Sequence, residues 1–460
     1  MTTEYHSSNQ ERDIAYVVHP HTNFDTHEKI GPHILERGEG VYVIDDKGNR
    51  YIEGVSGLWC TSLGFSEQRL VDAATKQMST LPFCQTFAHR SNRPAIELAE
   101  KLIEIAPVPM SKVLFQCSGS EANDTAIKLA WYHHRARGHD RKVKIIGRDR
   151  GYHGTGAATA SVTGLPYYHV DFNIPFEWVL HTDCPNHYRF AQAGESEEAF
   201  ATRLASNLED MILREGPENI AAFFAEPVMG VGGVVVPPAT YFEKIQAVLK
   251  RHDILLIADE VICGFGRTGT MWGCQSQGIQ PDLITCAKAM SAAYLPISAV
   301  LISETVYESM KEQTKKIGGF AHGYTYGGHP VCAAVALETI KIYEERNILG
   351  QVQESGAYLR ERLEEFANHS LVGDIRGVGL MQAIELVRNK ETREQFNINQ
   401  QVAGFVSKSA QDDGVIIRPV TGDTLAFAPP LIISRSEIDL IIGATAAALD
   451  KTEKWVSEQG

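Results

Sequence analysis

The 460-residue chain lacks the features that mark membrane, secreted and nucleic-acid-binding proteins. Its longest apolar runs, such as Ile254–Ala258, are far too short to cross a bilayer. Residues 1–13 have neither the basic start nor the apolar centre of a signal peptide, so we expect none. There is no basic cluster and the formal net charge is −14, which argues against nucleic acid or an anionic membrane as a partner.

Cysteine is present without a disulfide or metal-binding pattern, because none of the eight residues forms a CxxC pair. They are Cys60, Cys84, Cys117, Cys184, Cys263, Cys274, Cys286 and Cys332. Several lie inside apolar runs, which is typical of reduced core residues and predicts a cytoplasmic protein. Hydrophobic residues make up 43% and charged residues 22% of the chain, the usual balance for a folded globular protein.

The middle of the chain has no internal repeat and alternates short apolar runs with longer amphipathic segments. The runs are Val113–Cys117, Val143–Ile146, Ala221–Ala225, Ile254–Ala258, Leu283–Ala287 and Ala299–Ile302. Near-continuous apolar strands separated by helices predict a mostly parallel sheet that helices cover on both faces. In such α/β folds, ligands bind at the carboxyl ends of the strands.

The two flanks have a different pattern. Residues 36–53 predict a hairpin that turns at Asp46–Gly48. Helices are expected near 331–346, 350–367 and 396–413, and strands near 378–387 and 415–419. We therefore expect a large α/β domain of residues 68–330, and a smaller α+β domain that combines residues 1–67 with residues 331–460.

Two charged residues follow neighbouring apolar runs. Asp259 comes directly after Ile254–Ala258, and Lys288 directly after Leu283–Ala287. Their separation of 29 residues suits one strand–loop–strand unit, so both side chains are expected at one crevice. A desolvated lysine can lose its proton and attack a carbonyl to form an imine, and a carboxylate can keep a pyridine nitrogen protonated. Each residue alone is a weak signal, which becomes informative beside a phosphate site.

A phosphate site is indicated by the segment Ser118–Asp124, which directly follows the first apolar run. Ser118 and Glu121 have the spacing of a capping box, and helical periodicity continues to Arg135. A helix N-terminus offers free N–H groups and a positive dipole, both of which favour a phosphate. An ordinary helix cap would explain Ser118 but not the whole segment.

Eight motifs in one order make the chain resemble the class III, or ω-type, aminotransferases of pyridoxal-phosphate (PLP) fold type I. The motifs lie at 57–59, 118–124, 151–154, 225–227, 258–269, 287–288, 322–330 and 422–425. Each short motif could occur by chance, whereas eight in this order over nearly the whole chain form a specific signal. The resemblance implies a large mostly parallel-sheet domain with a smaller α+β domain, and PLP as cofactor.

The resemblance also implies roles for individual residues. Lys288 would carry the cofactor and later move a proton, while Asp259 would pair with its ring nitrogen. The other implied cofactor-binding residues are Gly119 and Ser120 at the phosphate, Tyr152 and Val261 on the two ring faces, Glu226, and Thr325 from a neighbouring subunit. The assignment of Thr325 implies a homodimer with composite sites, and leaves a homotetramer open.

Close to the cofactor the chain departs from relatives that act on ornithine and γ-aminobutyrate. Met229 and Val231 replace polar residues of those relatives, including a glutamate that can pair with an active-site arginine. Ile262 stands where they carry a glutamine. Ala289 and Ala293 follow the lysine where many relatives have glycine, and are expected to alter the shape of the pocket rather than its chemistry.

The arginine itself is identified as Arg418, which can grip a carboxylate through two parallel hydrogen bonds. Trp59, Phe87 and Tyr152 would wall an apolar substrate pocket beside Val231. This combination resembles the branch that transfers the amino group of a primary amine, diamine or ω-amino acid to a keto-acid such as pyruvate. An aminotransferase specific for an amino acid, an aminomutase or decarboxylase on the same fold, and a catalytically silent PLP-fold binding protein remain alternatives.

Two further patterns are set aside. Gly264–Gly269 matches a dinucleotide fingerprint, but no clear helix follows it and Asp282 lies too near for the usual acidic residue. Four histidines crowd the N-terminal segment, with spacings that match no familiar zinc pattern and with no cysteine partners. These are His19, His21, His27 and His33. We expect surface or interface histidines there and no metal site.

Overall fold

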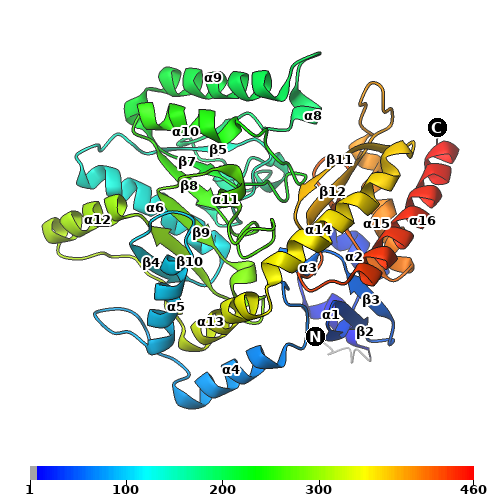
Figure 1. Cartoon of the computed structure of the whole chain (residues 1–460), viewed down its shortest axis with the longest axis horizontal. Coiled ribbons are helices and arrows are strands. Elements are labelled where there is room, and N and C mark those ends of the chain that lie inside the picture. Colours follow the sequence, from blue (N-terminus) through cyan, green and yellow to red (C-terminus); the bar gives the residue numbers. More distant parts are fainter. Residues whose placement is uncertain (1–7, 460) are drawn as a thin grey trace, which may run out of the picture.

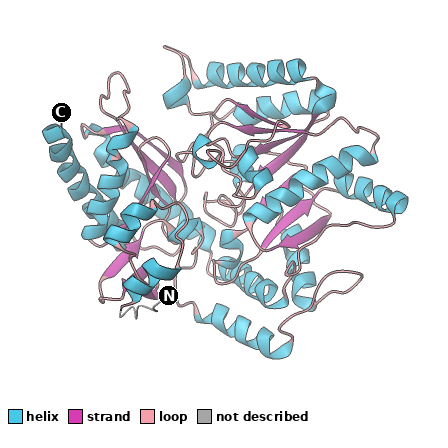
Figure 2. Ribbon diagram, turned by 180° about the vertical axis from the view of Figure 1, so that it is seen from behind, coloured by secondary structure: helices cyan, strands magenta, loops and turns pink. Residues whose placement is uncertain are grey.

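The computed structural model describes residues 8–459. Figure 1 shows two lobes, of which the larger carries a central sheet and the smaller combines the blue N-terminal elements with the orange and red C-terminal ones. Figure 2 shows helices on both sides of the strands. Described elements from the N-terminal and C-terminal parts of the chain therefore lie in the smaller lobe (Figure 1), and the division of the chain into two domains remains a prediction.

The large sheet has seven strands in the order β4-β10-β9-β8-β7-β5-β6. Their bounds are β4 Lys112–Gln116, β5 Lys144–Arg148, β6 Val179–Thr182, β7 Ile220–Ala225, β8 Leu255–Asp259, β9 Leu283–Cys286 and β10 Ser298–Ile302. All six predicted strands form within two residues of the expected bounds, and β6 is an additional one. Only β10 runs against its neighbours β4 and β9, so the mostly parallel sheet is confirmed.

Helices cover this sheet because its strands are apolar on both faces. On β7, Phe223 packs into the core beneath α9 (Glu197–Glu215) and α10 (Tyr241–Arg251). The next residue, Phe224, points to the opposite core, beneath α6 (Gly119–Ala136). Alternate side chains of one strand thus enter two separate cores. The strand ends are left free to carry polar residues.

The smaller lobe contains two four-stranded sheets. One has the order β1-β2-β3-β13, with β1 Leu35–Glu39, β2 Tyr42–Asp45, β3 Arg50–Glu53 and β13 Val415–Ile416. The other has the order β11-β12-β15-β14, with β11 Val372–Val378, β12 Met381–Leu386, β15 Thr424–Phe427 and β14 Arg418–Val420. The predicted turn at residues 46–48 joins β2 to β3, and β13 from the C-terminal part pairs with β3.

The remaining helices include those expected in the C-terminal third. They are α1 Asn9–Tyr16, α2 Phe24–Ile30, α4 Gln68–Thr80, α5 Arg93–Glu104, α12 Glu304–Ile317, α13 Pro330–Glu345, α14 Ile348–Glu364, α15 Val402–Asp412 and α16 Arg435–Gln459. The short helices are α3 Ser56–Trp59, α7 Ala157–Val162, α8 His187–Phe190 and α11 Gly273–Gln277. The helix expected at 396–413 begins only at Val402, because residues 398–400 form a separate 3-10 turn.

A buried arginine ties the two lobes together. Arg267, in the loop after β8, donates to the carbonyl oxygens of Leu380 (3.0 Å) and Pro429 (2.6 Å) and to Ser56 Oγ (3.1 Å). This residue belongs to the glycine-rich segment that resembles a dinucleotide fingerprint. Its guanidinium is enclosed by protein, and burial lowers its pKa to about 10. The segment therefore fastens the strand ends to the smaller lobe.

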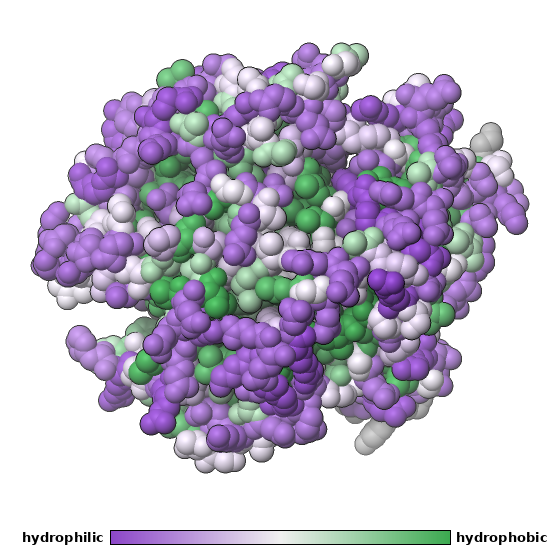
Figure 3. All heavy atoms as spheres, viewed as in Figure 1, coloured by the Kyte–Doolittle hydropathy of each residue, from purple (hydrophilic) through white to green (hydrophobic). Residues whose placement is uncertain are grey.

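The outer surface is mostly hydrophilic, with hydrophobic atoms gathered in crevices between the helices on the face shown in Figure 3. None of the helices in residues 8–459 combines the length and apolarity that a membrane span requires. All eight cysteines are free thiols, and five of them are buried, in agreement with their predicted place in the core.

Candidate active site

A cavity of about 110 Å³ that is open to solvent lies at the carboxyl ends of the large sheet's strands. It is lined by Gly119, Ser120, Asn123, Tyr152, His153, Gly154, Glu226, Asp259, Val261, Ile262 and Lys288. The structure thus brings together seven of the eight residues predicted to bind the cofactor. Thr325 is the exception.

Lys288 lies two residues after the end of β9 and has a left-handed backbone (φ 47°). Its side chain reaches into the cavity, where desolvation lowers the pKa of its ammonium group despite the opposing charges of Asp259 and Glu226. A lysine that loses its proton more easily than usual is a better nucleophile towards a carbonyl carbon. The strained backbone is a further sign that this position is held for function.

Asp259 is the last residue of β8 and is only 2% exposed. Its Oδ2 accepts hydrogen bonds from Asn123 Nδ2 (2.7 Å) and His153 Nδ1 (2.8 Å), and its Oδ1 accepts one from the Val261 backbone N–H (3.1 Å). Three donors hold the carboxylate in one orientation although it is buried. Such a fixed, charged acceptor suits a protonated ring nitrogen.

Asn123 is the residue that sequence reasoning missed. Its Nδ2 also donates to the His153 carbonyl oxygen (2.8 Å), and its Oδ1 accepts a hydrogen bond from Thr285 Oγ1 (2.6 Å). It therefore links α6, the loop after β5, the end of β8 and strand β9. The available signal was a polar residue four positions after Gly119, on the apolar face of the predicted helix. His153 also lines the cavity, and its Nδ1 contacts Asp259 Oδ2.

The N-terminus of α6 lies at the cavity, where the phosphate site is predicted. Ser118 caps the helix, with Glu121 N donating to Ser118 Oγ and Ser118 N donating to Glu121 Oε2, so the capping box is confirmed. A Cβ added to Gly119 would lie 2.9 Å from Val261 Cγ1, and one added to Gly154 would lie 2.5 Å from Ser120 Oγ. The space beside both glycines is therefore available only because side chains are absent.

Glu226 and Tyr152 close one side of the cavity. Glu226 Oε1 accepts a hydrogen bond from the Tyr152 backbone N–H (3.1 Å), and Oε2 accepts one from the Gly230 N–H (2.8 Å). Burial raises the pKa of the Glu226 carboxyl, and it raises the pKa of the Tyr152 hydroxyl to about 12. The Tyr152 ring stays neutral at physiological pH, and its far side packs on Tyr168 at 5.3 Å between ring centroids.

Two predicted substrate residues lie in the apolar core beside the cavity. Trp59 is 2% exposed, and its Nε1 makes no hydrogen bond within residues 8–459. It shares one cluster with Ile262, Met381 and the partly buried Val231. The side chain that replaces a polar residue at position 231 is therefore packed among apolar neighbours.

Arg418 begins β14 and is half-buried, outside the set of residues that line the cavity. Its positive charge nevertheless lowers the pKa values of Tyr152 and Glu53 against the larger effect of burial. Glu53, which sequence reasoning also missed, is a buried carboxyl at the end of β3. The charge of Arg418 therefore acts on the Glu53 carboxyl, whereas Val231 has no carboxyl with which Arg418 could interact.

Phe87 and Thr325 do not reach the cavity of their own chain. Phe87 is 40% exposed, and a Cβ added to Gly323 would lie 2.8 Å from its ring. Thr325 is exposed in the same neighbourhood, two residues further along. The two residues thus belong to one exposed surface rather than to the cavity wall.

The two alanines after the lysine do not shape the cavity directly. Ala289 is 2% exposed, and its carbonyl oxygen accepts a hydrogen bond from Tyr343 Oη (2.6 Å). Ala293 is exposed and has a left-handed backbone (φ 64°), a conformation that glycine adopts without strain. Neither lines the cavity. The expected change in pocket shape is not visible at these side chains.

A buried lysine, a fixed carboxylate and a glycine-lined helix N-terminus in one cavity define a PLP-dependent aminotransferase of fold type I. Comparison with known families agrees, since the model of the aminotransferase class-III family matches residues 24–449. The chain belongs to the class III aminotransferase family.

Its relatives carry two kinds of name. The chain is 50% identical over 430 residues to the mitochondrial "Gamma aminobutyrate transaminase 1" of Solanum lycopersicum, covering 93% of this chain and 83% of that protein. Among solved structures it matches the ω-transaminase of Pseudomonas jessenii in complex with PMP, with 53% identity and a TM-score of 0.97. That match covers 99% of this chain and 100% of the other. Class III aminotransferases depend on PLP.

The cavity fits this cofactor. Gly119, Ser120 and the free N–H groups of α6 suit its phosphate, and the orphaned buried Nε2 of His153 adds a polar atom near the carboxylate. Val261 and Tyr152 line the cavity where the two faces of a ring would lie. Asp259 would receive the ring nitrogen, and Lys288 the aldehyde carbon.

The hydrogen bond from Asn123 to Asp259 predicts that Asn123 contributes to the affinity for PLP. Asn123→Ala removes one of the three donors to the Asp259 carboxylate, and a hydrogen bond to a charged group contributes about 1.5–3 kcal/mol. We expect the affinity for PLP, measured by fluorescence titration of the cofactor-free protein, to fall about 10- to 100-fold.

Asn186→Ala is the matched control. Asn186 is also a buried asparagine, but its side chain accepts a hydrogen bond from the Arg189 N–H, away from the cavity. This variant should lose thermal stability while retaining wild-type affinity for PLP. Equal affinities for PLP in wild type and Asn123→Ala would contradict the role given to Asn123.

Proposed function

We propose that the chain is an ω-transaminase that moves the amino group of a primary amine, diamine or ω-amino acid to a keto-acid such as pyruvate. The observation that carries this proposal is the apolar wall beside the cavity, where Val231 packs with Trp59 and Ile262. A substrate group without charge can lie against such a wall at little desolvation cost. The carboxylate of a keto-acid needs a different contact.

When bound, PLP supplies an aldehyde that accepts the substrate amine and a ring that takes up electrons from the α-carbon. Residues of the chain would transfer the proton and position the cofactor. Lys288 Nζ, with its lowered pKa, would take a proton from the substrate carbon that bears the amino group and deliver it to the former aldehyde carbon of PLP. Asp259 would keep the ring nitrogen protonated, and Tyr152 and Val261, which line the cavity, would pack against the ring.

Arg418 is proposed to bind the keto-acid carboxylate. Its guanidinium is half-buried, and its positive charge acts on the Glu53 carboxyl and on the Tyr152 hydroxyl, of which Tyr152 lines the cavity. A substrate carboxylate could form a bidentate pair with it, and a substrate without a carboxylate would leave the arginine with Glu53. Such an arrangement lets one site alternate between amines and keto-acids.

The names of the relatives support the assignment as a transaminase, but they do not agree on the amino donor. Proteins named γ-aminobutyrate transaminases are 50% identical to this chain, closer than the departures at Met229 and Val231 led us to expect. Yet 4-aminobutyrate is itself an ω-amino acid and falls within the proposed substrates. An ω-transaminase variant with a tryptophan, a phenylalanine and an arginine replaced was "engineered for asymmetric synthesis of enantiopure bulky amines". Trp59, Phe87 and Arg418 are residues of the same three types.

We further propose that two copies of the chain complete each other's sites. The support is that Thr325 and Phe87, both implied to act at the site, lie on one exposed surface of the single chain. A two-fold dimer brings such a surface of each subunit to the same patch of the other. Thr325 would then contact the phosphate, and Phe87 the substrate, of the partner's cavity.

We also propose a reducing compartment, with the cytoplasm as the simplest case. The support is the set of eight free thiols, whereas the tomato and rice relatives are named for mitochondria or chloroplasts.

A donor panel tests the proposed substrates. With pyruvate as acceptor, 1-phenylethylamine, a diamine and 4-aminobutyrate should each yield alanine in a one-to-one ratio with the carbonyl product. Transfer from α-amino acids alone would contradict the proposal. Product without alanine would instead indicate the aminomutase or decarboxylase alternative.

Arg418→Ala tests carboxylate binding. We expect the KM for pyruvate to rise about 10- to 100-fold, because a charge-assisted pair is lost. Single-turnover conversion of 1-phenylethylamine should keep its wild-type rate, because this donor has no carboxylate. Arg388→Ala, at an exposed arginine paired with Glu394, is the control and should change neither value. Equal losses for both half-reactions would contradict the role of Arg418.

Complementation tests the composite site. Lys288→Ala lacks the attachment lysine, and Thr325→Asp places a negative charge where the partner's phosphate would bind, so each homodimer should be inactive. Co-expressed heterodimers should regain about a quarter of wild-type activity, since half the dimers contain one intact site. Lys288→Ala with Ser120→Asp is the control, because both residues belong to one cavity, and should stay inactive. No activity in the first pair would contradict the sharing of Thr325.

A further inference from the structure

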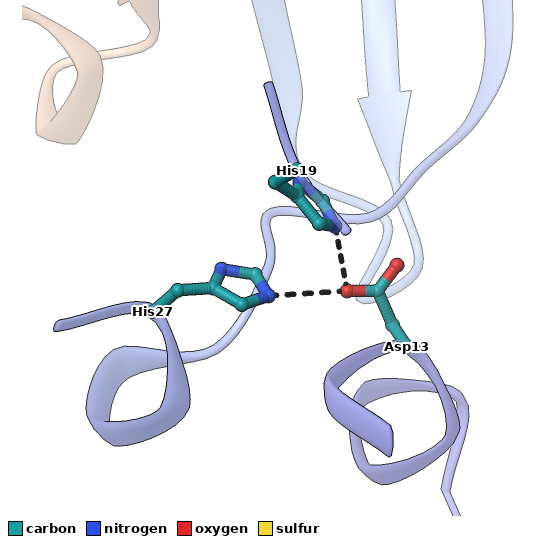
Figure 4. A group of neighbouring side chains, drawn as sticks. All are labelled: Asp13, His19 and His27. Atoms are coloured by element: carbon teal, nitrogen blue, oxygen red, sulfur yellow. Dashed lines mark hydrogen bonds and ion pairs between the residues drawn. The ribbon is translucent and has the colours of Figure 1, made fainter. Parts of the chain in front are cut away.

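The N-terminal segment holds three side chains that meet at a single oxygen atom. Asp13 lies on α1, His19 in the following turn and His27 on α2. His19 Nε2 is 2.8 Å and His27 Nε2 is 3.3 Å from the same Asp13 Oδ1, and all three ligand atoms lie within 4.8 Å of one another. Figure 4 shows both imidazole rings pointing their Nε2 atoms at this carboxylate.

Hydrogen bonds alone do not satisfy this cluster. His19 Nε2 is within hydrogen-bonding geometry of Asp13, whereas His27 Nε2 is buried and makes no hydrogen bond within residues 8–459. The His27 side chain is only 11% exposed, so water does not readily replace the missing partner. No lysine or arginine of the described chain forms an ion pair with Asp13. A buried nitrogen thus faces a carboxylate without a cation between them.

The atom types and spacings suit a transition metal. Zinc binds imidazole nitrogen and carboxylate oxygen at about 2.0–2.2 Å, so neighbouring ligand atoms in a tetrahedral site lie about 3.3 Å apart. The measured 2.8 and 3.3 Å are close to that value. Two imidazoles with one carboxylate favour zinc and similar late transition metals over magnesium or calcium, which prefer oxygen ligands.

We propose that Asp13, His19 and His27 bind one divalent transition-metal ion, zinc in the first instance, with water at the open position. The sequence spacing gave no sign of this site, because the carboxylate partner precedes the histidines and no cysteine takes part. Three ligands from α1, the turn and α2 form a chelate that closes two short loops of the chain.

The ion would tie together two helices that bury none of their residues in the described chain. Apolar packing therefore contributes little to their position. The turn between them places His21 against Tyr168, with ring centroids 5.1 Å apart. Tyr168 in turn packs on Tyr152, which lines the cavity of Lys288. Metal binding therefore fixes the N-terminal segment at the outer wall of the active site.

A second cluster of possible ligands is less suited to a metal. His134, His139 and Asp253 also lie close together. However, Arg137 Nη1 donates to Asp253 Oδ1 at 3.0 Å, so an arginine already neutralises the carboxylate. His134 Nε2 is engaged with the Ala221 carbonyl oxygen at 2.9 Å. This cluster is explained as a set of hydrogen bonds within the large domain.

Zinc titration of the holoenzyme tests the proposal. After chelator treatment and desalting, wild type should bind one equivalent of ZnCl₂ per chain. Asp13→Asn and His27→Gln should bind zinc more than about 100-fold more weakly, because each variant loses a ligand and even the loss of a residue that only orients a ligand costs about 10- to 100-fold in affinity. His33→Gln is the matched control, since His33 contacts Gln411 outside the cluster and should bind zinc like wild type. Titration with MgCl₂ should give no binding at this site.

Hydrogen exchange gives the second readout. Zinc should slow amide exchange of residues 9–31 in wild type and in His33→Gln, but not in His27→Gln. Retained cofactor absorbance shows that each variant is folded, independently of the metal. Equal zinc binding by wild type, Asp13→Asn and His27→Gln would overturn the site, as would loss of binding only in a His134→Gln variant. Zinc binding that leaves exchange of residues 9–31 unchanged would overturn the proposed role in ordering the segment.

Discussion

The buried carboxylate of Asp259 is the constraint on which the rest of the site depends. A charge that is 2% exposed at the end of β8 requires donors, and the chain supplies Asn123, His153 and the Val261 N–H. These donors come from three different segments, so satisfying one carboxylate fixes α6 and the loops after β5 and β8 relative to each other. The same arrangement places the glycine-lined helix end and Lys288 around one cavity. The hydrogen bonds that stabilise the buried Asp259 carboxylate therefore also position the residues of the cofactor cavity.

Much of the fold could be predicted from the sequence, because buried parallel strands appear in it as short, near-continuous apolar runs. All six predicted strands of the large sheet form, and Asp259 and Lys288 end up in one cavity because they follow neighbouring strands. The capping box at Ser118 was equally visible, since its spacing is local. What could not be predicted depends on contacts between distant segments: Asn123 turns towards Asp259, Glu53 approaches Arg418, and Arg267 fastens the lobes together.

Substrate choice and the N-terminal cluster show the same limit. The apolar neighbours of Val231 and Trp59 are visible only once β12 and the loop after β8 are placed beside them. Asp13, His19 and His27 meet because two short helices fold back on each other, not because of a regular spacing. Thr325 and Phe87 lie together on an exposed surface, so the roles proposed for them would require a second copy of the chain. The cavity itself is local to the strand ends and could be predicted, whereas contacts between distant surfaces could not.

The central claim is that Lys288 carries the cofactor. Borohydride reduction of the holoenzyme makes that linkage permanent, and peptide mass spectrometry then locates it. The account predicts the mass of one phosphopyridoxyl group on the peptide that contains Lys288, and on no other lysine. Attachment at a different lysine, or an unmodified Lys288 peptide in protein that retains cofactor and activity, would contradict it.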